Sequence, residues 1–181
     1  MKIFWFTGLS GAGKSTIAKK ARDILEKEGK KVLLLDGDEI RAKYSQALSF
    51  SREDIIRNNR FIAGLCKEKI NEFDYIFVSV ITPFLEIRSE LRDSFAGQYV
   101  EIYVKASLDE VIQRDVKGLY KKALEGKISN FIGIDPKIPY EPPERPDFVI
   151  ETGNQSVECS LEQFISFVHD GLKVNQKNVR K

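Results

Sequence analysis

The sequence is poor in the side chains that most often build metal centres and disulfides. Its 181 residues include two cysteines, Cys66 and Cys159, whose spacing matches no metal-binding pattern. Both lie in helix-like patterns, so we expect buried packing in a reduced, cytoplasmic setting. The only histidine, His169, falls near the end of the last expected helix, where a surface position is a better interpretation than catalysis.

Net charge and long apolar runs are also scarce. The formal net charge is +2, which is too small to favour nucleic acid or an anionic membrane as a general partner. No apolar run is long enough to cross a bilayer, and no signal peptide is visible because a strand-like pattern begins almost at Met1. A small-molecule substrate is therefore the expected partner.

What the sequence does contain is a complete phosphate-binding loop, Gly8-Leu9-Ser10-Gly11-Ala12-Gly13-Lys14-Ser15, which matches G-x-x-x-x-G-K-[ST] at every fixed position. A strand-like run at residues 3–7 precedes it, and a run with helical spacing follows from Thr16. Backbone N–H groups of such a loop surround a polyphosphate, and the helix dipole faces the same anion. Lys14 can reach the β- and γ-phosphates and the Ser15 hydroxyl can bind Mg²⁺, so the expected ligands are ATP and Mg²⁺.

Four further strand-like runs alternate with helix-like patterns. The strands are expected at residues 32–35, 75–80, 99–104 and 147–150, and the helices start near capping signals at Ser51, Thr82, Ser107 and Ser160. This alternation predicts an α/β fold with a five-stranded, mainly parallel sheet and helices on both faces. We expect a single domain, residues 1–172, with a lid at about 117–146, followed by a basic tail, residues 173–181.

The expected position of a Walker-B aspartate carries no acidic side chain. Residues 78–81, at the end of the third strand, read Val-Ser-Val-Ile. An aspartate from another strand end must therefore assist the metal, and Asp36 and Asp38 follow the second strand. Asp38 can hold a water on Mg²⁺ or accept a hydroxyl proton. A plain turn is the other interpretation of Asp36-Gly37-Asp38, but the neighbouring phosphate loop favours function.

Seven sequence blocks together carry a resemblance to one family. They are residues 8–15, 35–38 with Arg41, 50–54, 81–83, 114–120, 130–135 and 140–143, and they resemble the adenylyl-sulfate kinases over residues 2–152. The Lys-Gly-Leu-Tyr-Lys, Phe-x-Gly-Ile-Asp and Tyr-Glu-Pro-Pro blocks are far more specific than the phosphate loop. The resemblance implies a P-loop kinase, built as a three-layer sandwich with a lid. Such a kinase transfers the γ-phosphate of ATP to the 3′-hydroxyl of adenosine 5′-phosphosulfate (APS), uses Mg²⁺ and forms a homodimer.

The resemblance also implies a role for each matching residue. Lys14, Asp36, Asp38 and Thr82 are the catalytic candidates, with Ser15 and Asp38 at the metal. The ATP contacts are the loop residues Gly8 to Ser15 together with Thr16 and Arg114. The implied substrate contacts are Asp38, Arg41, Phe50, Asn58, Ile81, Thr82, Lys117, Leu119 and Phe131. Phe50 and Phe131 are expected to hold the substrate base between their rings, since stacking suits a planar base.

Four positions depart from the family pattern, and one of them concerns the anionic end of the substrate. Ile55 stands where the family has an arginine that contacts the phosphosulfate. Arg57 lies about 200° further round a helix and is a poor replacement. Losing one charge-assisted contact weakens binding by ~1.5–3 kcal/mol. Among the other three departures, Ser49 stands in place of the family glycine, and Thr82 stands in place of the family serine. Residues 84–88, the third, are less basic than the same stretch of the family.

Two other functions stay open on the sequence alone. One keeps the reaction and changes the acceptor to another nucleotide anhydride, such as cytidine diphosphoramidate in capsule polysaccharide modification, which the uncharged Ile55 would suit. The other is a nucleotide-binding domain without turnover. Such a domain would be expected to lack Lys14, Asp38 or the lid block at 117–121, and all three are present.

Overall fold

The centre of the molecule is a parallel sheet. The structure, a computed structural model, describes residues 1–44 and 49–170. Within these residues the strands are β1 (Lys2–Thr7), β2 (Val32–Asp36), β3 (Tyr75–Ser79), β4 (Tyr99–Lys105) and β5 (Phe148–Glu151). They lie in the order β2-β3-β1-β4-β5, and every neighbouring pair is parallel. The predicted α/β sheet is confirmed; the predicted tail lies outside the described residues.

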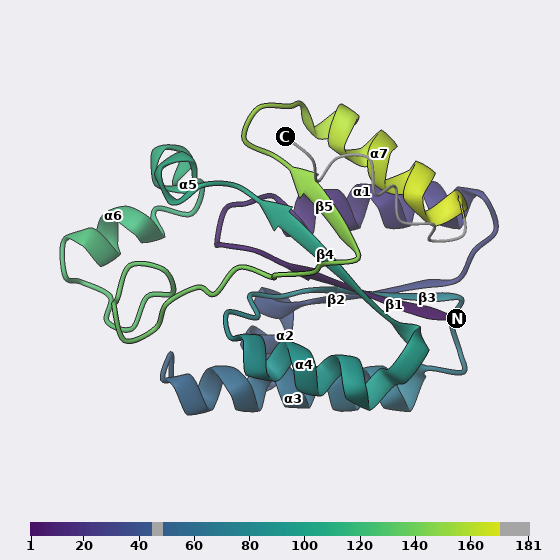
Figure 1. The fold of residues 1–181 in the computed structure, drawn as a ribbon, viewed down its shortest axis with the longest axis horizontal. Coiled ribbons are helices and arrows are strands. Elements are labelled where there is room, and N and C mark those ends of the chain that lie inside the picture. The colour runs from purple at the N-terminus through teal and green to yellow at the C-terminus, as the bar shows by residue number, and fades with distance from the viewer. Residues whose placement is uncertain (45–48, 171–181) are drawn as a thin grey trace.

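Helices cover both faces of this sheet. One face carries α1 (Lys14–Lys27) and α7 (Val157–His169), and the other carries α2 (Gly37–Tyr44), α3 (Arg52–Lys69) and α4 (Leu85–Phe95) (Figure 1). The one-turn helix η1 (Ala96–Gln98) leads into β4. The short helices α5 (Leu108–Arg114) and α6 (Leu119–Leu124) lie at the end of the sheet where the parallel strands finish (Figure 1). The arrangement is the expected three-layer sandwich.

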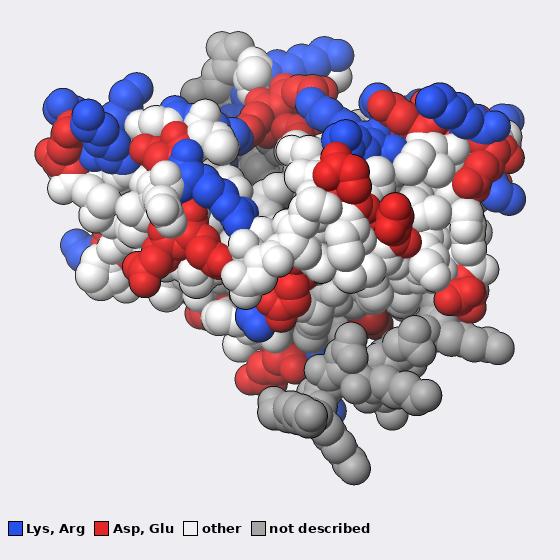
Figure 2. Space-filling view, turned by 90° about the horizontal axis from the view of Figure 1, so that it is seen from above, with Lys and Arg blue, Asp and Glu red and all other residues white. Residues whose placement is uncertain are grey.

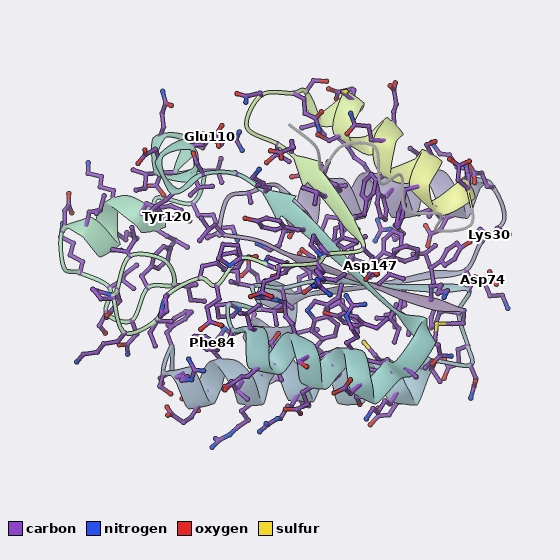
Figure 3. All side chains as sticks on the ribbon, in the orientation of Figure 1. Lys30, Asp74, Phe84, Glu110, Tyr120 and Asp147 are labelled. Atoms are coloured by element: carbon purple, nitrogen blue, oxygen red, sulfur yellow. The ribbon has the colours of Figure 1, made fainter. Side chains whose placement is uncertain are left out.

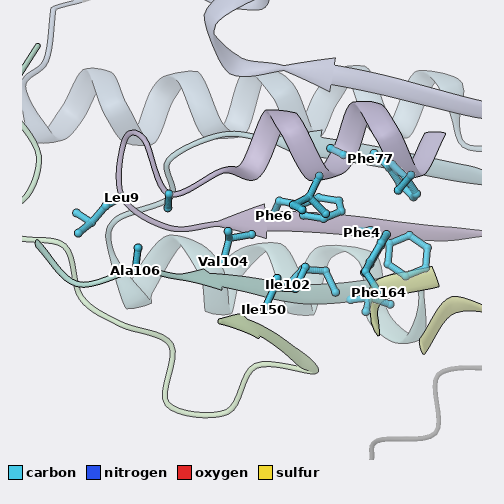
Figure 4. Packing of buried hydrophobic residues seen from close by; sticks show 14 of the residues in the cluster. Phe4, Phe6, Leu9, Phe77, Ile102, Val104, Ala106, Ile150 and Phe164 are labelled. Atoms are coloured by element: carbon cyan, nitrogen blue, oxygen red, sulfur yellow. The ribbon is translucent and has the colours of Figure 1, made fainter. Parts of the chain in front are cut away.

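Strand β1 is the middle strand, and its alternation divides the core in two. Phe4 and Phe6 face α1 and α7, whereas Trp5 faces α3 and α4. Phe164 of α7 packs edge-on against Phe4 at 5.6 Å and Phe6 at 5.1 Å between ring centroids, and Phe77 of β3 completes the group (Figure 4). Buried aromatic pairs of this geometry stabilise a core beyond their burial alone. The position of β1, and so of the loop after it, is fixed from both faces.

Two predicted helix starts are confirmed at the residue expected. The Ser51 side chain accepts a hydrogen bond from the Asp54 N–H, and α3 begins at the next residue. Ser107 and Glu110 form a reciprocal capping box at the start of α5. In both cases a side-chain oxygen satisfies an N–H group that has no partner inside the helix.

Two other predicted helix starts are wrong. Thr82 does not cap a helix, because its hydroxyl is buried and bonded elsewhere, and α4 begins after Phe84. The last helix begins one turn earlier than expected, after Ser156, whose side chain accepts from the Cys159 N–H. Ser160 is inside that helix and buried. Ser156 has Cys159 and not Glu or Gln three residues on, so the capping-box pattern favoured Ser160, although the Ser156 hydroxyl caps the helix by itself.

The cysteine and histidine predictions are largely confirmed. Cys66 is buried, and its burial raises the pKa of the thiol to about 12. Cys159 is only partly buried, so the expectation of a fully packed side chain is wrong there. His169 is exposed and lies 2.9 Å from a carboxylate oxygen of Glu28.

Charge is mixed rather than concentrated on the surface. The face seen from above carries Lys and Arg beside Asp and Glu, as the small net charge leads one to expect (Figure 2). Across residues 1–44 and 49–170, no helix has both the length and the apolar character that a membrane crossing requires.

The packing of α7 leads to a prediction about stability. Replacing Phe164 by Ala removes a fully buried ring from the aromatic group around β1, so we expect the free energy of unfolding to fall by ~3–5 kcal/mol. Urea denaturation followed by circular dichroism would measure this. The matched control is Leu124→Ala, at a side chain that is 59% exposed, where the expected change is within about 0.5 kcal/mol. Equal effects of the two substitutions would contradict the packing account.

Candidate active site

A cavity of about 430 Å³ lies where the parallel strands end. Its wall contains most of the residues predicted to act: Ser10, Gly11, Gly13, Lys14, Ser15, Thr16, Asp36, Asp38, Arg41, Phe50, Asn58, Ile81, Lys117, Leu119 and Phe131. Five predicted residues do not line it, namely Gly8, Leu9, Ala12, Thr82 and Arg114. Carboxyl ends of parallel strands are where ligands of open α/β sheets bind.

The loop after β1 has a backbone that requires glycine. Gly8 has φ 150°, and a Cβ there would lie 2.3 Å from the carbonyl oxygen of Val104 on β4. Gly13 precedes α1 in a left-handed conformation, with φ 102°. An L side chain at either position would strain the backbone. These conformations let the loop turn its N–H groups toward a bound anion at the start of α1.

Lys14 is buried inside this loop. Its ammonium donates to the carbonyl oxygens of Gly8 at 2.9 Å and Leu9 at 2.8 Å. Burial, with a smaller contribution from nearby Lys117, lowers the pKa of Lys14 to about 7, while Asp38 and Asp36 oppose the shift. A polyphosphate bound in the loop would restore the preference for the charged amine, because an opposite charge favours the protonated form.

Asp36 lies directly beside the loop serine. The Ser15 hydroxyl is 2.5 Å from a carboxylate oxygen of Asp36 and 2.9 Å from the Ser79 hydroxyl. The other Asp36 oxygen accepts the Asp38 N–H at 3.0 Å. Hydroxyl and carboxylate oxygens are the ligands that Mg²⁺ prefers, with the phosphates supplying the rest. The donor set therefore fits Mg²⁺, although within the described ranges no three His, Cys, Asp or Glu side chains cluster as a metal site.

Asp38 and Lys117 form an ion pair across the cavity. Asp38 is in the first turn of α2, and Lys117 lies two residues before α6 begins at Leu119. Both side chains are exposed, so the ion pair is accessible to solvent. A carboxylate and an ammonium thus meet in the wall of the cavity that the phosphate loop also lines.

Two aromatic rings line the cavity from different segments. Phe50 is 42% exposed, and the Arg41 guanidinium lies 4.6 Å from its ring centroid. Phe131 is buried and meets the ring of Tyr120 edge-on at 5.0 Å. Tyr120 donates to the Ser10 carbonyl at 2.9 Å and so joins α6 to the phosphate loop. It lies at the end of the sheet near Glu110, opposite Lys30 and Asp74 (Figure 3).

The wall formed by α3 is uncharged. Ile55, Asn58 and Asn59 line the cavity, and all three are buried. Arg57, which the sequence indicated to be a poor replacement for the family arginine, points away from them and pairs with Asp54 at 3.6 Å. No cation of α3 therefore stands at the position where the family arginine is expected.

Thr82 and Arg114 are placed next to the site rather than in its wall. Thr82 is fully buried, and its hydroxyl accepts from Trp5 Nε1 and donates to Asn59. Arg114 donates to the Thr152 carbonyl at 2.6 Å, and the Thr152 hydroxyl in turn donates to the Ala12 carbonyl. Arg114 thus reaches the phosphate loop through one intermediate residue.

Sequence reasoning missed two polar side chains of the wall, those of Ser79 and Asn59. Ser79 ends β3, next to β1 in the sheet, and contacts the hydroxyl of Ser15. Its position at the carboxyl end of a central strand was the available signal. Asn59 gave no signal in the sequence, since a polar residue in a predicted amphipathic helix is ordinarily read as exposed.

The fold and the cavity together define a class. A P-loop kinase has a phosphate loop with a lysine, and serine and aspartate oxygens beside that loop. It also has a separate side for an acceptor, which is lined here by aromatic rings. The comparisons narrow the class. The adenylylsulphate kinase family model matches residues 1–151, and the chain belongs to that family.

Individual relatives agree with the family model. The chain is 43% identical over 169 residues to an adenylyl-sulfate kinase of Acaryochloris marina, covering 93% of this chain and 82% of that protein. It is 43% identical over 164 residues to an adenylyl-sulfate kinase of Chloroflexus aurantiacus, covering 91% and 87%. The structure of the Mycobacterium tuberculosis APS kinase in complex with AMPPNP and APS superposes with a TM-score of 0.87 at 32% identity, covering 93% and 97%.

The lowered pKa of Lys14 predicts how ATP affinity depends on pH. The free protein loses the ammonium above about pH 7, whereas the phosphate-bound amine keeps it to higher pH. Affinity for a non-hydrolysable ATP analogue should therefore weaken by up to about tenfold per pH unit between about pH 7.5 and 9, where the triphosphate charge no longer changes. Isothermal titration calorimetry would measure the dissociation constant.

The control for this experiment is Lys14→Arg. A guanidinium stays charged across the whole range, so the variant should bind more weakly but with little pH dependence. A wild-type dissociation constant that does not change between these pH values would contradict the lowered pKa.

Proposed function

We propose that this chain phosphorylates the 3′-hydroxyl of APS with ATP as the donor. The observation that carries the proposal is the Asp38–Lys117 pair at the junction of the phosphate loop and the aromatic acceptor side of one cavity. A hydroxyl bound at Asp38 lies next to the loop that would hold the γ-phosphate. Family membership supplies the acceptor.

The reaction is an in-line phosphoryl transfer. The 3′-oxygen forms a bond to the γ-phosphorus, the bond between that phosphorus and the β–γ bridging oxygen breaks, and ADP leaves. Asp38 accepts the hydroxyl proton, while Lys14 and Lys117 neutralise charge on the phosphoryl oxygens. Phe50 and Phe131 hold the base, and Arg41, Asn58, Ile81 and Leu119 complete the acceptor side.

Mg²⁺ belongs to the proposal as well. When bound, it would supply neutralisation of the charge that develops on the phosphates. Ser15 would be the direct protein ligand. Asp36 lies 2.5 Å from the Ser15 hydroxyl and so orients it, and Asp38 would hold a water on the metal.

The remaining expectations are extended to this chain as proposals. They are a single domain over residues 1–172, a lid over 117–146 with Arg114 on the ATP side, a homodimer and a cytoplasmic location. Two contacts support the lid boundaries: Tyr120 joins its beginning to Ser10, and the Glu141 N–H donates to the Pro83 carbonyl at its end. Thr82 is retained as a residue that supports the acceptor side, since its hydroxyl is buried.

A second acceptor is favoured by one observation. The α3 wall of the cavity is neutral at Ile55, Asn58 and Asn59, which suits a 5′ group with less negative charge than a sulfate. The same 3′-hydroxyl transfer to cytidine diphosphoramidate, in capsule polysaccharide modification, is the corresponding second candidate.

The decisive assay compares the two acceptors. With ATP and Mg²⁺, we expect ADP release at low acceptor concentration to be at least roughly tenfold faster with APS than with the cytidine nucleotide. The reason is that the protein should stabilise the transition state for APS by at least one more good contact than the transition state for the cytidine nucleotide. Lys14→Ala should remove turnover with both and so exclude a contaminating ATPase. Faster turnover of the cytidine nucleotide would overturn the APS assignment and support the second acceptor.

Two aspartate variants separate the metal from the proton. Asp38→Asn should lower kcat by ~10²–10⁴-fold at saturating Mg²⁺, because the hydroxyl proton loses its acceptor. Asp36→Asn should mainly raise the Mg²⁺ concentration needed for half-maximal rate, by ~10–100-fold, because it orients the ligand Ser15. Steady-state rates across a Mg²⁺ titration measure both. If the two variants show the same Mg²⁺ dependence, the assigned roles are wrong.

A further inference from the structure

The segment after β3, residues 81–83, is held by side chains from several elements. Trp5 of β1 donates its indole N–H to the Thr82 hydroxyl at 2.7 Å, and Thr7 donates to the Thr82 carbonyl at 3.2 Å. The buried Arg88 of α4 donates to the same carbonyl. The segment provides Ile81 to the cavity wall, so these bonds fix one side of the acceptor pocket.

Asn59 joins this segment to the opposite wall. Its side-chain oxygen accepts the Thr82 hydroxyl at 2.9 Å, and its amide donates to the Ile55 carbonyl at 2.9 Å and faces the Ile81 carbonyl at 3.5 Å. The side chain is 1% exposed. Both ends of the amide are therefore used within the protein, although Asn59 is part of the cavity wall.

The consequence is a chain of buried hydrogen bonds, which we call the Thr82 network: Trp5, Thr82 and Asn59. It runs from β1 through the loop after β3 to α3, at the level of Ile55 and Asn58. Buried networks of this kind are strong only when every member is satisfied, and they fix one relative placement of the elements they join. Here the elements joined are the two sides of the acceptor pocket.

We propose that Asn59 is a positioning residue for the acceptor nucleotide. It holds α3, with Ile55 and Asn58, against Ile81, and so sets the width of the acceptor side. The phosphate loop is fixed separately, by β1, β4 and Tyr120. Loss of Asn59 should therefore affect acceptor binding and leave ATP binding almost intact. This inference rests on the proposed function for the identity of the acceptor, but not for the network.

The main variant is Asn59→Leu, which keeps the size of the side chain and removes its polar atoms. We expect the KM for APS to rise roughly tenfold, because a tenfold change corresponds to the free energy of one buried hydrogen bond. The kcat and the KM for ATP should stay within about twofold of wild type, because an interaction lost equally from ground and transition state changes KM alone. Thr82→Val should raise the APS KM similarly, and the double variant should add little, because both act through one bond.

The matched control is Ile62→Ala, on the same helix. Ile62 is fully buried in the core and does not line the cavity, so its loss lowers stability without touching the network. The melting temperatures of Ile62→Ala and Asn59→Leu are compared first. If Asn59 has only a structural role, two variants with similar melting temperatures should have the same KM for APS. That result would overturn the proposal.

Trp5 supplies a second, independent readout, since it is the only tryptophan in the sequence. Its indole N–H gives a single identifiable proton resonance. In Asn59→Leu the Thr82 hydroxyl loses its acceptor, so the indole resonance should shift. An indole resonance that does not respond to Asn59→Leu overturns the proposal whichever nucleotide is the acceptor.

The two proposals fail in different ways. If wild-type protein phosphorylates the cytidine nucleotide and not APS, the proposed function is wrong, and the Asn59→Leu kinetics are measured with that acceptor instead. If wild type uses APS and Asn59→Leu does so with an unchanged KM, the proposed function stands and the role of Asn59 is wrong.

Discussion

The interaction on which the site depends is the burial of a lysine ammonium inside a loop of backbone. Lys14 has two carbonyl oxygens as partners and little access to water, which leaves it close to losing its proton. Such a group gains more from a bound polyphosphate than a solvated lysine would, because the surrounding dielectric is low. The glycine backbone and the central position of β1, packed from both faces, hold this loop in place.

Side chains from distant parts of the sequence converge on the loop after β3. Trp5, Thr7, Asn59 and Arg88 all bond to Thr82. Arg88 also donates to the Glu141 carbonyl, which anchors the end of the lid there. Strand β1, helix α3 and the segment around Glu141 are thus tied to one short segment, so a shift of any of them would disturb buried hydrogen bonds. This gives the cavity a defined shape before a ligand binds.

Charge within the cavity is distributed unevenly. The cations Lys14 and Lys117 and the carboxylates of Asp36 and Asp38 lie toward the phosphate loop, whereas α3 contributes only neutral side chains. Arg41 of α2 is a further cation of the wall and lies over the Phe50 ring. The donor side is therefore suited to a highly charged ligand that is neutralised on binding. The side lined by Phe50 and Phe131 offers aromatic surface, and under the proposed function acceptor selectivity would depend on how the walls of that side are placed.

The sequence by itself determined the phosphate loop, the parallel sheet, the helix caps at Ser51 and Ser107, and most residues of the cavity wall. These follow from local patterns: backbone conformations that require glycine, strand and helix periodicity, and blocks with a family resemblance. The tertiary structure decided what a side chain contacts. It placed the Thr82 hydroxyl in a buried network and not at a helix cap, brought Ser79 and Asn59 to the site, and paired Asp38 with Lys117. Such contacts join residues 23 to 79 positions apart, and no local pattern records them because they arise only when separate elements pack.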